Sequence, residues 1–99
     1  VIQRGTNANG EFVRFADGTQ ICTQVVGSPS NSADTTWTFP AQFVTATGLS
    51  VHVTGRTGSD AIIGSARPPS TASVAFNAFN TSGARTTAAV SLLAMGRWF

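Results

Sequence analysis

Charged residues are scarce in this sequence. Only 10% of the 99 residues are charged and 41% are hydrophobic, whereas charged residues make up about a quarter of an average soluble domain. Lysine is absent, and no run of basic residues could follow a phosphate backbone, which argues against nucleic acid as a partner. We expect another chain to cover part of so weakly charged a surface. The basic residues are Arg4, Arg14, Arg56, Arg67, Arg85 and Arg97.

Cysteine and long apolar runs are also nearly missing. Cys22 is the only cysteine, so the chain can form no intrachain disulfide and no zinc site from cysteine pairs. We expect it to be a small buried side chain within a strand. No apolar run approaches the roughly 20 residues that a membrane-spanning helix needs, and no signal peptide is apparent, so we expect no membrane insertion. The absent initiator methionine suggests a fragment of a longer chain.

The sequence contains no recognisable catalytic constellation. Its four acidic residues, Glu11, Asp17, Asp34 and Asp60, are far apart in the chain. A glycosidase needs two carboxylates on either side of the bond, and although Asp34 with Asp60 is conceivable, no surrounding pattern supports that pair. His52 is the only imidazole, and no G-x-S-x-G elbow accompanies any serine. We therefore predict no enzymatic activity and no cofactor.

A β-hairpin is the clearest local prediction, and it lies within N-A-N-G-E-F-V-R-F-A-D-G-T-Q-I-C at residues 7–22. Two runs of alternating side chains, 11–15 and 19–23, flank Asp17 and Gly18. This dipeptide is typical of a two-residue hairpin turn, because both positions tolerate positive φ angles. Residues 1–10 show no sustained period, so we expect them to form a lead-in loop.

The rest of the chain also predicts strands. The last run is apolar almost throughout, as in a strand that is covered on both faces. Strands separated by turn signals, without a convincing amphipathic helix, indicate an all-β antiparallel β-sandwich. It has seven strands, or six if residues 61–65 are not a strand. The further predicted strands are 36–39, 49–54, 61–65, 73–79 and 88–95.

Three segments together resemble the C-terminal receptor-binding domain of bacteriophage tail-fibre proteins. They are the hairpin at residues 7–22, W-T-F-P-A-Q-F at 37–43 and L-L-A-M-G-R-W at 92–98. The resemblance implies a β-sandwich similar to H-type lectins, assembled as a homotrimer at the distal end of a tail fibre in the virion. It further implies a lead-in segment from the fibre shaft at residues 1–10 and a receptor-binding domain at 11–99. Trimer formation would bury apolar strand faces and so account for the scarcity of charge.

The resemblance implies host adsorption, in which each tip binds a bacterial surface glycan or protein without catalysis. If the shaft enters at residue 1 and every strand reverses direction, the loops at Asp17, 42–48 and 67–71 lie at the far tip. If 61–65 is not a strand, loop 80–85 replaces 67–71, whereas 42–48 is distal in both cases. The predicted contact residues are Gln42, Thr45 and Thr47, together with Arg67 or with Asn80 and Arg85.

Two alternatives remain open from the sequence. His52 is expected on the outer face of a strand or at a subunit contact, but a threefold axis could also bring three copies together as a metal site. The chain as a whole could instead be a structural module that only caps or trimerises a fibre. Such a module would bind neither glycans nor cells.

Overall fold

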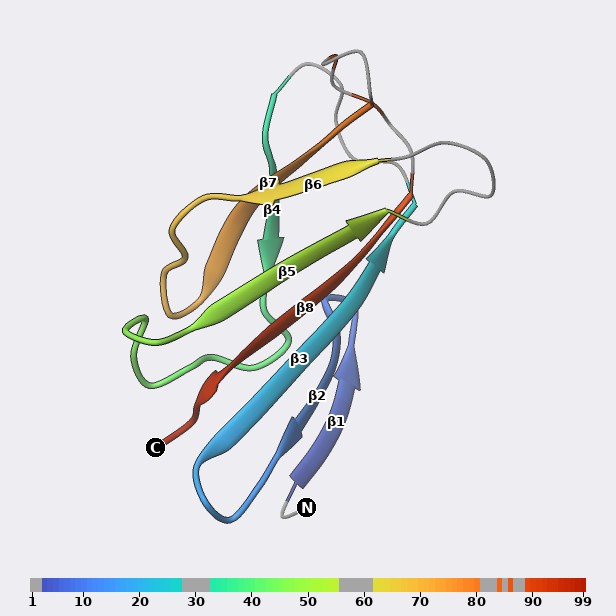
Figure 1. The fold of residues 1–99 in the computed structure, drawn as a ribbon. Helices are drawn as coiled ribbons and strands as arrows, with labels where there is room; N and C mark the ends of the chain where they lie inside the picture. The colour runs from blue at the N-terminus through green and yellow to red at the C-terminus, as the bar shows by residue number, and fades with distance from the viewer. Residues whose placement is uncertain (1–2, 28–32, 56–61, 81–83, 85, 87–88) are drawn as a thin grey trace.

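In the residues that the computed structural model describes, all regular structure is β (Figure 1). The structure describes residues 3–27, 33–55, 62–80, 84, 86 and 89–99. Among these residues, no helix is long and apolar enough to span a membrane. The strands are β1 Gln3–Asn7, β2 Gly10–Arg14, β3 Thr19–Val26, β4 Thr35–Thr38, β5 Ser50–Gly55, β6 Ile63–Ala66, β7 Ser73–Phe79 and β8 Val90–Arg97.

The eight strands form two antiparallel sheets, which confirms the predicted antiparallel β architecture. One sheet has the order β1-β2-β3-β8-β5 and the other β4-β7-β6. The region predicted as a strand at 61–65 does contain one, because Ile63 and its neighbours in β6 pair with β7. The chain therefore has every strand that the sequence predicted and one more, β1.

Alternate side chains of the two sheets meet in a single core. Strand β7 turns Val74 and Phe76 inward, and β8 does the same with Leu92. The outward-facing Met95 of β8 is 42% exposed, so within a single chain this strand is covered on one face. That its second face is also covered stays a prediction. The buried apolar side chains are Cys22, Trp37, Phe39, Phe43, Val74, Phe76, Ala78, Val90, Leu92 and Ala94.

The prediction of a lead-in loop at residues 1–10 is wrong, because Gln3–Asn7 forms β1. This edge strand pairs antiparallel with β2, and Ala8 and Asn9 connect the two. The Asn9 N–H donates to Asn7 Oδ1 at 2.8 Å, which stabilises the connection. The sequence did not predict β1 because nearly all its side chains are exposed, so the segment has no alternation of apolar and polar residues. That this segment leaves a fibre shaft stays a prediction.

The predicted hairpin is confirmed, but its turn differs from the expected one. The Phe15 N–H donates to the Thr19 carbonyl at 2.9 Å, and the Gly18 N–H donates to the Phe15 carbonyl at 3.1 Å. Gly18 has a φ of 98°, whereas Asp17 has a negative φ. The connection is therefore a longer loop closed by a glycine bulge. The Thr19 N–H donates to Asp17 Oδ1 and thereby lowers the pKa of this carboxyl.

The three segments that carry the tail-fibre resemblance contact one another in the structure. Each contact is a hydrogen bond from a side chain of one segment to a backbone carbonyl of another. They run from Trp98 Nε1 to Phe15 (2.8 Å), from Gln20 Nε2 to Ala41 (3.0 Å) and from Trp37 Nε1 to Asn9 (2.9 Å). The most recognisable residues of the sequence therefore hold the sandwich together.

We expect Cys22 to resist alkylation while the chain is folded. Its side chain is fully buried on β3, and burial raises the pKa of the thiol to about 11. Because the thiolate is the reactive form, iodoacetamide at pH 8 should label Cys22 slowly in buffer and rapidly in urea, as mass spectrometry would measure. Equal labelling rates in the two conditions would contradict the placement of Cys22 in the core.

Candidate functional site

The loops predicted at the far tip lie at the end of the sandwich where β1 begins. The strand register places Gln3, Arg14, Gln20 and Ser50 at the same end of the five-stranded sheet. Figure 1 shows both chain ends on this side. If a shaft enters at residue 1, loop 42–48 therefore lies near that entry and not distal to it as predicted, because the unpredicted strand β1 adds one reversal of direction.

The predicted contact residues of loop 42–48 make local hydrogen bonds. Gln42 Nε2 donates to Thr71 Oγ1 at 3.2 Å, so this loop meets the connection between β6 and β7. Thr45 Oγ1 accepts the Thr47 N–H at 3.1 Å, which shapes the turn. Gln42 and Thr47 are exposed and Thr45 is half-buried. Their role in receptor binding stays a prediction.

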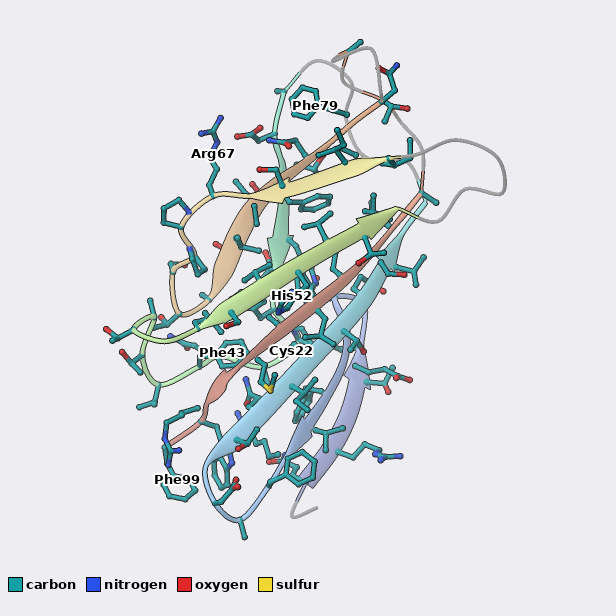
Figure 2. The ribbon with its side chains drawn as sticks, in the orientation of Figure 1. Cys22, Phe43, His52, Arg67, Phe79 and Phe99 are labelled. Atoms are coloured by element: carbon teal, nitrogen blue, oxygen red, sulfur yellow. The ribbon has the colours of Figure 1, made fainter. Side chains whose placement is uncertain are left out.

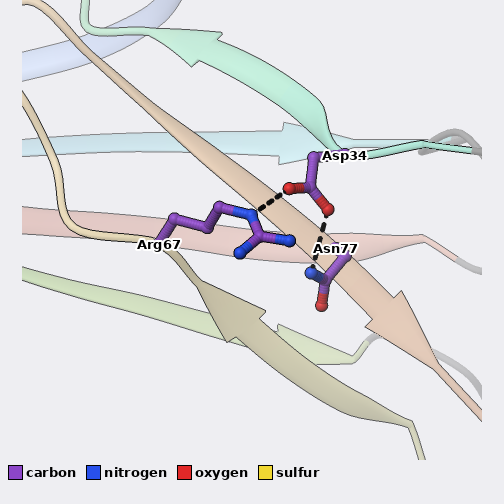
Figure 3. Close-up of polar contacts among 3 residues, drawn as sticks. All are labelled: Asp34, Arg67 and Asn77. Carbon is purple, nitrogen blue, oxygen red and sulfur yellow. Dashed lines mark hydrogen bonds and ion pairs between the residues drawn. The ribbon is translucent and has the colours of Figure 1, made fainter.

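Arg67 belongs to a polar cluster on the outer face of the three-stranded sheet (Figure 3). Its Nε donates to Asp34 Oδ2, and the second carboxylate oxygen, Oδ1, accepts a hydrogen bond from Asn77 Nδ2 at 3.1 Å. The three residues come from different parts of the chain: Arg67 follows β6, Asp34 precedes β4, and Asn77 lies within β7. The small sheet thus assembles the cluster.

The cluster orients Arg67 while leaving most of its donors unused. The Arg67 side chain is 62% exposed, whereas that of Asp34 is only 20% exposed. The hydrogen bond to Asp34, followed by the attraction between the charges, raises the pKa of Arg67. A guanidinium carries N–H groups on three nitrogens, and Nη1 and Nη2 have no hydrogen-bond partner among the residues that the structure describes. Arg67 therefore presents an oriented pair of nitrogens to solvent.

Asn77 fixes the base of the cluster. This residue is only 6% exposed, and its Oδ1 is buried without a hydrogen-bond partner in the described part of the chain. A buried acceptor left unpaired costs about 1–3 kcal/mol. Such unpaired buried atoms are uncommon, and a bound water or ion is a frequent explanation for them. The sequence held one signal for this residue, since Asn77 interrupts an otherwise largely apolar run in β7.

The structure does not bring the other predicted contact residues to this cluster. Asn80 follows the end of β7, where its N–H donates to the Ala84 carbonyl at 2.9 Å and its Oδ1 accepts the Ala84 N–H at 3.1 Å. Asn80 is thus hydrogen-bonded to Ala84 through both its backbone and its side chain. Arg85 and Asp60 lie outside the described residues, so the structure does not report on the Asp34 and Asp60 pair.

His52 lies on the other sheet, where its exposed side chain points away from the core (Figure 2). It lines an open groove of about 860 Å³ on the outer face of the five-stranded sheet. Within the described ranges, no group of three His, Cys, Asp or Glu residues could hold a metal ion. A metal site that uses His52 from three copies stays a prediction.

Comparison with known proteins links this fold to tail fibres. No protein-family model matches the sequence, and a search of curated proteins found no match. The chain does match the solved structure of an N-truncated R2-type pyocin tail fiber, with a TM-score of 0.72 and 22% sequence identity. The match covers 96% of this chain but only 37% of the fibre chain. The resemblance inferred from the sequence is thus confirmed in the fold: over nearly its whole length, the chain is folded like part of a pyocin tail fibre.

Proposed function

We propose that this chain is a tail-fibre domain that binds a bacterial surface glycan for host adsorption, without catalysis. The observation that carries the proposal is the exposed Arg67 guanidinium, which Asp34 holds through Nε while Nη1 and Nη2 remain unpaired within the described part of the chain. The pyocin fibre fold supports a place in a virion tail. Arg67 is the predicted contact residue that the polar cluster with Asp34 orients toward solvent.

The geometry of Arg67 indicates the chemistry of the ligand. The two outer nitrogens of a guanidinium form a planar fork that matches the oxygens of a carboxylate or a phosphate. Asp34 adds acceptor oxygens beside that fork. We therefore expect a glycan that carries carboxylate or phosphate groups, with additional hydroxyls near Asp34. Because Asp34 offsets part of the positive charge, each single contact is weak.

Weak contacts become effective when several copies bind together. A homotrimer would present three Arg67 clusters, and a fibre-bearing particle many more, so avidity can exceed the affinity of one site by orders of magnitude. The scarcity of charge, 10% of residues, suits a chain whose surface is partly covered by its neighbours. The low charge content thus supports the assembly on which multivalent adhesion would depend.

Binding of the chain to host cells and to their purified surface polysaccharide tests the proposal. Arg67→Ala should weaken binding about 10- to 100-fold, the range for losing hydrogen bonds to a charged group. Arg67→Lys should recover little of this loss, because lysine keeps the charge but lacks the planar fork. Urea unfolding of each variant serves as the stability control, because Arg67→Ala also leaves the Asp34 carboxylate, which is only 20% exposed, without its ion-pair partner.

Arg4→Ala provides a matched control, because Arg4 is also exposed but lies on edge strand β1, in the other sheet. This variant should bind like the wild-type chain. Wild-type binding by Arg67→Ala would move the site elsewhere on the molecule. If the unmodified chain bound neither cells nor any glycan, the alternative of a capping or trimerisation module would replace this proposal.

A further inference from the structure

The outer face of the five-stranded sheet carries an open groove of about 860 Å³ that the Arg67 cluster does not use. The groove is on the face of this sheet that points away from the core, whereas Arg67 lies on the outer face of the other sheet (Figure 2). Its volume falls in the range of about 300–1,000 Å³ that is usual for small-molecule sites. The lining residues include Thr6, Glu11, Thr23, His52, Ser91 and Leu93.

The strand register aligns most of these residues in one row. Successive partners across the sheet are Thr6, Glu11, Thr23, Leu93 and His52. Neighbouring strands are about 4.8 Å apart, so Glu11 and His52 are separated by three spacings, or roughly 14 Å. The row is thus long enough for a short oligosaccharide and too long for a single sugar ring.

The groove combines polar groups with a small apolar floor. The hydroxyls of Thr23 and Ser91 can each donate and accept a hydrogen bond. Leu93 lies between Thr23 and His52 in the row, and Ser91 is two residues before Leu93 on β8. The carboxylate of Glu11 is exposed and has no ion-pair or hydrogen-bond partner in the described part of the chain. An unpaired carboxylate beside hydroxyls complements a ligand rich in O–H donors and repels acidic groups.

We propose that this groove is a second glycan site, which binds a neutral oligosaccharide. Glu11 accepts hydrogen bonds from sugar hydroxyls, Thr23 and Ser91 exchange hydrogen bonds with others, and Leu93 contacts the apolar face of a ring. This inference rests on the proposed function in one respect, namely that the ligand is part of a cell-surface glycan. The domain then has one site for anionic glycans and one for neutral glycans, on its two outer faces.

The test is a titration of the isotope-labelled chain with maltotriose, mannotriose and triacetylchitotriose, followed by nitrogen–proton correlation spectra. At least one of these trisaccharides should shift the amide signals of Thr23, Leu93 and His52. Glu11→Gln and Thr23→Val should each weaken that binding about 2- to 10-fold, as expected for one lost hydrogen bond. Arg67→Ala should leave it unchanged.

Two results would overturn the groove site. One is the absence of any shift at these amides with all three trisaccharides, and the other is unchanged affinity in both Glu11→Gln and Thr23→Val. Neither result bears on the Arg67 cluster, whose test is the loss of cell and polysaccharide binding in Arg67→Ala. The two proposals therefore fail independently. Thr38→Val, at an exposed position of β4 in the other sheet, serves as the matched control and should leave trisaccharide binding unchanged.

Discussion

Replacing Gly10 with alanine is expected to unfold the domain or leave it severely destabilised. Gly10 begins β2 with a φ of 125°, and a Cβ at this position would lie 2.1 Å from the carbonyl oxygen of Thr23. That oxygen belongs to the backbone of β3, so it cannot move without disturbing the sheet. The strained backbone and the steric overlap together should cost about 2–6 kcal/mol, against a total stability of about 5–15 kcal/mol.

Substitutions at two other glycines distinguish the cost of backbone strain from the cost of steric overlap. Gly48 has a φ of 77° but open space around its Cβ position, so Gly48→Ala should show only the backbone cost of about 1–2 kcal/mol. Gly27 has neither a positive φ nor a neighbour within 4 Å, and Gly27→Ala should stay within about 0.5 kcal/mol of the wild type. Urea unfolding of all three variants measures the series. Equal losses for Gly10→Ala and Gly48→Ala would contradict the close contact with Thr23.

Phe76→Ala is expected to be the most damaging substitution in the core. Phe76 is fully buried at the middle of the three-stranded sheet, opposite Thr35 of β4 and Ala66 of β6. Removing a buried phenylalanine ring costs about 3–5 kcal/mol, because the cavity that remains collapses only in part. For a chain of this length, each kcal/mol lowers the melting temperature by roughly 4–8 °C.

Phe99 is the matched control for Phe76. Its ring is 56% exposed and packs edge-on against Trp98 with 4.7 Å between the ring centroids. Phe99→Ala should therefore cost less than about 1 kcal/mol. Thermal unfolding of the two variants compares a buried ring with an exposed one, and similar melting temperatures would contradict the position of Phe76 between the sheets.

Strands that alternate between core and solvent could be predicted from the sequence, and β5 is the clearest case because Val51 and Val53 turn inward while His52 and Thr54 turn outward. Strand β1 could not be predicted in this way. Its backbone pairs with β2 alone, and its side chains are polar on both faces. Missing one strand reversed the predicted direction of every later loop.

The candidate site shows a different limit of sequence reasoning. Arg67 was predicted from an expected position at the far tip, which the structure does not give it. Its partner Asp34 is 33 residues away, and Asn77 is 43 residues from Asp34. Only the pairing of β4, β7 and β6 brings these side chains together. Local sequence patterns carry no information on contacts between residues so far apart in the chain. The sequence therefore could not predict that Arg67 Nε pairs with Asp34 while its Nη groups stay unpaired in the described part of the chain.

The central claim, that Arg67 contacts a charged surface glycan, is tested most directly by its own Nε–H signal. Nitrogen–proton spectra of the arginine side chains can be recorded while purified anionic surface polysaccharide of the host is added. We predict that the Arg67 Nε–H signal shifts in proportion to binding, whereas that of Arg4 stays in place. Binding of the polysaccharide with an unchanged Arg67 signal, or no binding at all, would contradict the claim.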